Sequence, residues 1–187
     1  MNEKQTKAIA SIGLFTGGLF GMIGSLVSSA SFRGLAWGLD GVALIVASTL
    51  LTVYYFRKGY DTLAAGFLIF AIGEGLIMSC NATDLNKDVS SFCAGVSLWA
   101  AALALISSQN VFPKIVRLTG LIAAVLFVVV SVQILSGSYV DPITKPLPFY
   151  AYPFFVATIF GWGWKLGGKN GFRPPGVLPH SQYNMNE

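Results

Sequence analysis

Long runs of apolar residues divide this chain, and they constrain its fold more than any other feature of the sequence. A helix of about 20 residues crosses the hydrocarbon core of a bilayer, which is roughly 30 Å thick. Within that core the backbone must satisfy its own hydrogen bonds, so we expect helices, and the alternating pattern of a membrane β-strand is absent. The six predicted spans cover residues 8–30, 34–56, 62–80, 92–112, 115–136 and 148–166.

The composition agrees with a protein that lies in lipid. Of the 187 residues, 54% are hydrophobic and 11% are charged, and the charged fraction of an ordinary soluble domain is about twice as large. We therefore predict an all-α integral membrane protein, a six-transmembrane-helix bundle that forms one domain over residues 1–170. A proline-rich polar tail over residues 171–187 is predicted to be disordered.

Lysine and arginine residues lie at the ends of the apolar runs and predict the orientation. One side holds Lys4, Lys7, Arg57, Lys58, Lys114, Arg117, Lys165, Lys169 and Arg173, and the other holds Arg33, Lys87 and Lys145. The positive-inside rule then places both termini in the cytoplasm, and we expect the plasma (inner) membrane. We expect the lipid bilayer as a partner, because the apolar runs lie in it. We expect no nucleic acid, because these basic residues occur singly or in pairs and form no basic patch.

Two carboxylates, Asp40 and Glu74, lie inside the predicted spans. Each is six residues from the same predicted outer surface, about 9 Å along neighbouring antiparallel helices. A charge at such a depth is costly, and residues of this kind typically mark ion or proton pathways. The sequence therefore predicts a polar pocket that opens outward, in which Asp40 and Glu74 hold a cation or exchange a proton.

Further polar and aromatic side chains are expected at the same depth, namely Trp37, Ser131, Gln133, Tyr150 and Tyr152. The aromatic rings among them could hold an organic cation. In an alternative interpretation the acids bind no ligand. Asp40 then reaches the interface or pairs with Arg33, and Glu74 is a neutral acid that hydrogen-bonds to a serine or a tyrosine.

Two further features concern packing and covalent links. Cys80 and Cys93 flank the most polar predicted loop, where an oxidising compartment would allow a disulfide, and the alternative is two thiols in helix ends. Gly13, Gly17 and Gly21 form a row in the first span that lets another helix approach closely. Packing within the bundle is the simpler explanation of this row, and a dimer face is the alternative.

Several kinds of chemistry lack their usual residues. The single histidine, His180, is in the tail, and the lysine within a predicted span, Lys165, is at the end of that span. The sequence has no phosphate-binding glycine loop, Gly-x-Ser-x-Gly elbow or Cys-x-x-Cys motif. We therefore expect no cofactor and no metal centre. The sequence favours a protein that is not an enzyme, although an intramembrane acid/base pair remains an alternative.

Two functions remain from the sequence. The first is a small transporter or channel-like protein for a cation, a proton or a small organic cation, and such a protein is expected to form a homodimer because six short helices enclose little space. The second is a non-catalytic membrane subunit or assembly factor, which would bind another membrane protein through the glycine face and the outer loop.

Overall fold

The computed structural model describes residues 2–82, 88–138, 140 and 143–168, with the side chains of residues 81 and 82 excepted. The predicted tail and the middle of the polar loop, residues 83–87, lie outside the described residues. The described residues form six α-helices: α1 (Glu3–Leu26), α2 (Ala30–Phe56), α3 (Asp61–Ala82), α4 (Val89–Ser108), α5 (Lys114–Leu135) and α6 (Tyr152–Gly167).

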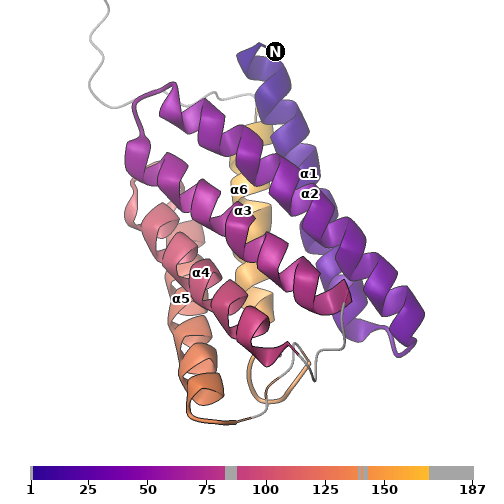
Figure 1. Ribbon diagram of the computed structural model, residues 1–187. Coiled ribbons are helices and arrows are strands. Elements are labelled where there is room, and N and C mark those ends of the chain that lie inside the picture. The colour runs from indigo at the N-terminus through magenta and orange to yellow at the C-terminus, as the bar shows by residue number, and fades with distance from the viewer. Residues whose placement is uncertain (1, 83–87, 139, 141–142, 169–187) are drawn as a thin grey trace, which may run out of the picture.

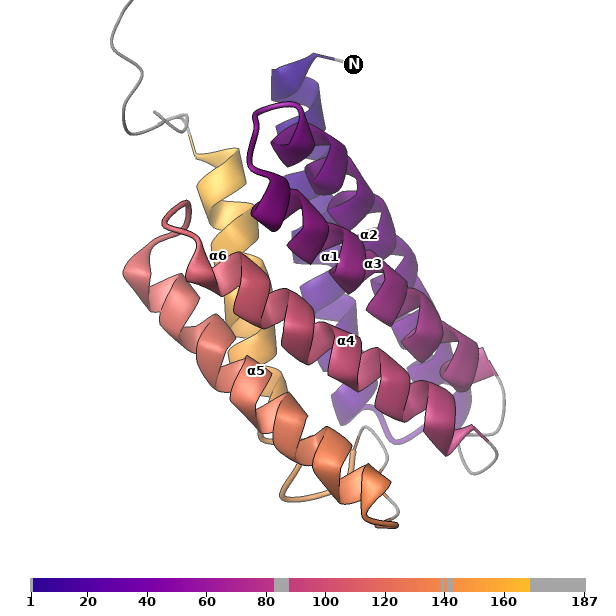
Figure 2. The ribbon, with the colours of Figure 1, turned by 60° about the vertical axis from the view of Figure 1, so that its left-hand side comes forward.

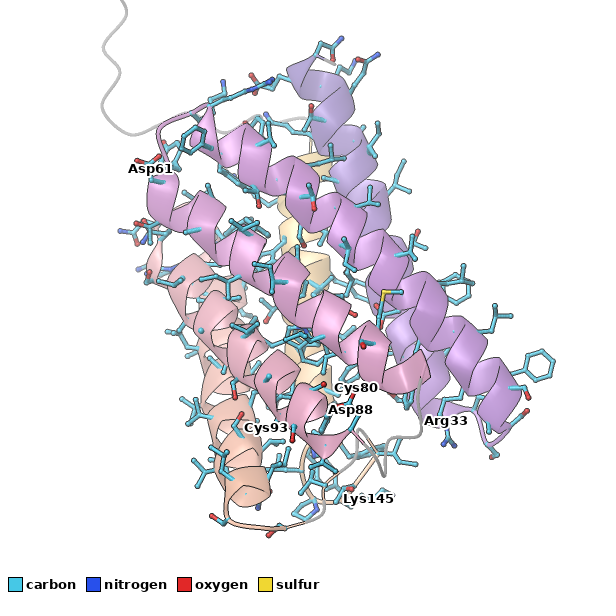
Figure 3. All side chains as sticks on the ribbon, viewed as in Figure 1. Arg33, Asp61, Cys80, Asp88, Cys93 and Lys145 are labelled. Carbon is cyan, nitrogen blue, oxygen red and sulfur yellow. The ribbon has the colours of Figure 1, made fainter. Side chains whose placement is uncertain are left out.

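The helices form a ring and run alternately in opposite directions (Figure 1). Each helix packs against its neighbours in sequence, and α6 closes the ring by packing between α1 and α5 (Figure 2). We call the end of the bundle where α1 begins and α6 ends the N-terminal end. Figure 3 shows Asp61 near this end, and Arg33, Asp88 and Lys145 at the opposite end.

Among the described helices, α1 to α5 are long and apolar enough to cross a membrane. Their outward faces carry large apolar side chains, including Ile12, Leu26, Leu35, Ile115 and Leu135, each more than 60% exposed. A soluble protein rarely exposes so much contiguous apolar surface. The structure is therefore that of a helical membrane bundle.

Helix α6 is shorter than the predicted sixth span. It begins at Tyr152 instead of Pro148 and has 16 residues, so its length is about 24 Å at 1.5 Å per residue. Pro153 lies in the first turn, where its missing N–H removes no helical hydrogen bond. Pro153 therefore lies where the helix begins and does not kink it, and residues 147–151 form turns.

Two other helices begin earlier than predicted because polar caps set their first residues. Helix α1 begins at Glu3 and not at residue 8, because Asn2 and Gln5 form a reciprocal capping box. Helix α4 begins before residue 92 because the Asp88 carboxylate accepts a hydrogen bond from the Ser91 N–H at 3.3 Å. In these two helices hydropathy marks the part that lies in lipid, whereas a polar cap sets where the helix begins.

The glycine row of α1 lies against α2. A Cβ atom at Gly13 would be 2.9 Å from the Ala43 carbonyl oxygen and 2.9 Å from the Ala47 Cβ, and one at Gly17 would overlap the side chain of Leu44. Without side chains at these positions the two backbones approach closely. The row is thus covered by a helix of the same chain, as the interpretation of packing within the bundle predicts.

Aromatic rings fill the interior of the ring of helices. Tyr55 stacks on Phe67 with centroids 5.6 Å apart, Phe67 meets Trp162 edge-on at 5.2 Å, and Trp162 contacts Phe70 at 5.8 Å. The contacts continue to Phe155, Trp99 and Phe127. We call these seven residues the aromatic column. Because they come from α2 to α6, the column connects five helices at the centre.

Replacing Gly13 by alanine should destabilise the bundle, because the new methyl group would meet the backbone of α2. Overpacking of this kind costs about 1–3 kcal/mol, so the melting temperature of the protein in detergent should fall by several degrees. Gly38→Ala is the control, because a Cβ at Gly38 meets no described atom within 4 Å. Equal melting temperatures for the two variants would contradict the close approach of α1 and α2.

Candidate functional site

Asp40 on α2 and Glu74 on α3 are both buried, with exposed fractions of 6% and 2%. They line one cavity of about 30 Å³, which has room for roughly one or two water molecules. The Glu74 carboxyl lies against α2 next to Asp40, since a Cβ atom at Gly41 would be 3.4 Å from Glu74 Oε1. The structure therefore brings together the two acids that the sequence singled out.

All six helices contribute to the walls of this cavity. The lining residues are Ser25, Trp37, Asp40, Glu74, Ile77, Phe92, Val96, Trp99, Phe127, Pro148 and Tyr152. Ser25 lies in the last turn of α1 and Phe92 in the first turns of α4. The cavity therefore lies on the axis of the ring, toward the end opposite the N-terminal end.

Several polar atoms of these lining residues lack hydrogen-bond partners within the described part of the chain: Asp40 Oδ1, Glu74 Oε2 and Trp99 Nε1. The Trp99 indole lies beside the Glu74 carboxyl. The other Asp40 oxygen, Oδ2, is 3.5 Å from the Tyr152 hydroxyl, a long contact for an O–H donor. Each buried polar group without a partner costs about 1–3 kcal/mol. A cation, a proton or a water molecule between the two carboxyls would satisfy several of these atoms at once.

Neither carboxyl forms an ion pair with a basic side chain of the described residues. Arg33, the alternative partner considered for Asp40, instead donates from Nε and Nη2 to the Val27 carbonyl at 3.2 and 3.0 Å. Its guanidinium also lies 5.9 Å from the Trp37 ring centroid. The chain's own described cations therefore do not neutralise this acidic pair.

Gly21 and Trp99 belong to the site although the sequence analysis did not assign them to it. A Cβ atom at Gly21 would be 2.7 Å from Asp40 Oδ2 and would overlap the Tyr152 hydroxyl. The glycine therefore leaves the space in which that hydroxyl and the Asp40 carboxyl meet. The sequence analysis identified Gly21 as a member of the glycine row, but only the pairing of α1 with α2 shows that Gly21 faces Asp40.

The remaining predicted site residues divide into two groups. Trp37 and Tyr152 line the cavity, whereas Ser131, Gln133 and Tyr150 do not. Ser131 is buried between α4 and α5, where its hydroxyl lies 2.9 Å from the Ser97 hydroxyl and donates to a backbone carbonyl of its own helix. Gln133 is half-buried, and Tyr150 is 55% exposed.

The predicted disulfide between Cys80 and Cys93 is not found in the described structure, where the alternative of two thiols in helix ends holds. The Cys80 thiol donates to the Leu76 carbonyl of its own helix at 3.0 Å, and the Cys93 thiol donates to the Ser131 carbonyl of α5 at 3.8 Å. Cys93 thus faces α5 and not α3, although both cysteines lie toward the same end of the bundle (Figure 3).

If the carboxyl of Glu74 is kept for function, removing it should stabilise the protein. Glu74→Met has a similar volume and removes the buried oxygen Glu74 Oε2, which has no described partner, and such replacements of buried ionic groups are often neutral or stabilising. We expect a melting temperature in detergent that is unchanged or higher by a few degrees. Asp61→Asn, at an exposed carboxyl in the first turn of α3, is the control. A large fall for Glu74→Met alone would assign Glu74 a structural role.

The comparisons with known proteins do not add to this geometry. No protein-family model, curated protein or solved structure matches the chain.

Proposed function

We propose that this protein is a small membrane transporter or channel-like protein that binds a proton or a small inorganic cation between Asp40 and Glu74. One observation carries the proposal: two buried carboxyls with unpartnered oxygens share one axial cavity, and no described basic side chain pairs with them. Acidic residues in such surroundings typically belong to ion paths or proton relays.

The size of the cavity narrows the substrate class. A volume of about 30 Å³ fits a proton on a water molecule or an inorganic cation that has lost most of its hydration shell. A small organic cation, which the sequence left open, is too large for this space. Tyr150, one of the rings considered for such a ligand, is largely exposed and does not line the cavity.

The aromatic column supports a gated path in place of an open pore. At one end of the column Trp99 and Phe127 line the carboxyl cavity. At the other end Tyr55 lines a second cavity, at the N-terminal end of the bundle. Between them lie the rings of Phe70, Trp162 and Phe67. In this arrangement the carboxyls exchange ions with the end opposite the N-terminal end, and transfer across the bundle requires these rings to move.

The proposed orientation places the N-terminal end in the cytoplasm of a plasma (inner) membrane. The described basic residues at this end are Lys4, Lys7, Arg57, Lys58, Lys114, Arg117 and Lys165, against Arg33 and Lys145 at the opposite end, and this imbalance follows the positive-inside rule. Helix α6, together with the turns before it, then provides the sixth crossing.

A homodimer or a membrane-protein partner remains part of the proposal. The surface for either would differ from the α1 glycine row, because α2 covers that row.

Neutralising the acids should abolish transport. In sealed vesicles that contain the purified protein, Asp40→Asn and Glu74→Gln should each reduce proton or sodium flux at least tenfold, because each removes a negative charge from the cavity. An internal pH-sensitive dye and radioactive sodium measure the two fluxes. Asp61→Asn should keep the wild-type rate.

Wild-type rates in both cavity variants would contradict the proposal. No flux from the wild-type protein, together with a membrane protein that co-purifies with it, would instead favour the non-catalytic subunit.

Gly21→Ala should also lower the flux several-fold, although it changes no charge. The added methyl group would displace the Asp40 carboxyl and the Tyr152 hydroxyl from their contact. Gly34→Ala, where a Cβ meets no described atom within 4 Å, is the matched control. If both variants transport at the wild-type rate, the position of the Asp40 carboxyl does not limit transport.

A further inference from the structure

A second cavity, much larger than the first, opens at the N-terminal end. Its volume is about 550 Å³, within the range of ligand-binding pockets. It is lined by Glu3, Lys4, Lys7, Ala8, Tyr54, Tyr55, Val111, Lys165, Leu166, Gly167 and Gly168. We call it the basic vestibule. Its walls come from α1, α2, the turn after α4 and the end of α6, so it lies at the mouth of the ring.

The single acidic group described in the basic vestibule is already bound. Glu3 accepts hydrogen bonds from Lys7 and Lys58, both at 2.8 Å, and from the Tyr54 hydroxyl at 3.2 Å. Lys58 lies outside the vestibule lining, and its hydrogen bond to Glu3 raises the pKa of the Lys58 ammonium. The negative charge of Glu3 is therefore balanced, and the vestibule keeps a net positive charge.

That positive charge belongs mainly to Lys4 on α1 and Lys165 on α6. Neither forms an ion pair with an acidic residue of the described chain. Both line the vestibule, and they come from helices that pack against each other. A phosphate group between them has oxygens for both ammonium groups, and a lysine is a common point-charge ligand of phosphate.

The remaining wall is apolar or aromatic, formed by Ala8, Val111, Leu166 and the tyrosines. This combination suits an amphiphilic ligand, whose phosphate would face the lysines while its less polar part packs on the rings. The vestibule also lies where positively charged residues attract anionic lipid headgroups.

We propose that the basic vestibule binds a phosphate group, carried by an anionic phospholipid or by a soluble phosphate ester, between Lys4 and Lys165. This site does not depend on the function proposed for Asp40 and Glu74. The two sites lie at opposite ends of the aromatic column.

Native mass spectrometry of the full chain in detergent tests the proposal, with phosphatidylglycerol and phosphatidylcholine as lipid probes and inorganic phosphate as the soluble probe. We expect the wild-type protein to retain phosphatidylglycerol or inorganic phosphate, which carry a net negative charge, in preference to the zwitterionic phosphatidylcholine. Lys4→Gln/Lys165→Gln should reduce that retention about tenfold, equivalent to about 1.4 kcal/mol.

The control is Arg57→Gln/Lys114→Gln, which removes the same charge from the same end but outside the vestibule. It should retain the probe as the wild type does. Lys4→Arg/Lys165→Arg keeps the charge and should restore binding.

The probes also identify the source of the phosphate. Retention of phosphatidylglycerol that inorganic phosphate does not displace supports a lipid ligand, and displacement at millimolar phosphate supports a soluble ester. Equal retention of the anionic and zwitterionic lipids without phosphate binding would overturn the proposal. Equal losses in the vestibule and control pairs, or failure of the arginine pair to restore binding, would also overturn it.

Discussion

Close packing between helices is the interaction on which this structure depends. In lipid an apolar helix face gains no hydrophobic free energy by leaving the acyl chains, so association relies on contacts that lipid tails cannot match. The chain achieves such contacts by backbone approach at Gly13 and again at Gly73 and Gly95, where a Cβ on either glycine would be 3.1 Å from the other's carbonyl oxygen. The aromatic column then fills the space that the ring of helices encloses.

The same close packing creates the carboxyl site. Gly21 provides room for the Asp40 carboxyl at the seam between α1 and α2, and Gly41, which provides room for Met78, lies beside the Glu74 carboxyl at the seam between α2 and α3. A charged residue at the centre of a membrane helix costs about 2.5–3.5 kcal/mol, and no described ion pair offsets that cost here. The stability of the rest of the ring must therefore exceed it. No described ion pair explains two acids at this position, and the proposed cation site is an explanation for their presence.

The sequence predicts the parts of this structure that depend on length and depth. Runs of apolar residues locate the helices, and the helical rise places Asp40 and Glu74 at one level on neighbouring helices. The sequence does not predict how each helix is rotated about its own axis, because that rotation depends on which helix faces pack together. Ser131 was expected at the cavity from its depth alone, but its face of α5 meets Ser97. Trp99 was missed for the converse reason, since an apolar run does not show which ring will face the Glu74 carboxyl.

The two cavities have opposite charge, and the distance between them decides how strongly they can influence each other. Asp40 and Tyr54 are 14 residues apart on α2, which is about 21 Å along the helix. At an effective dielectric constant of about 20, two unit charges at that separation interact by roughly 0.8 kcal/mol. A phosphate in the basic vestibule would therefore change the affinity of the carboxyl cavity for a cation about fourfold for each unit of charge. In the proposed transporter, an effect of this size would adjust transport without switching it on or off, and the rings of the aromatic column, which lie between the two cavities, would form the barrier to an ion.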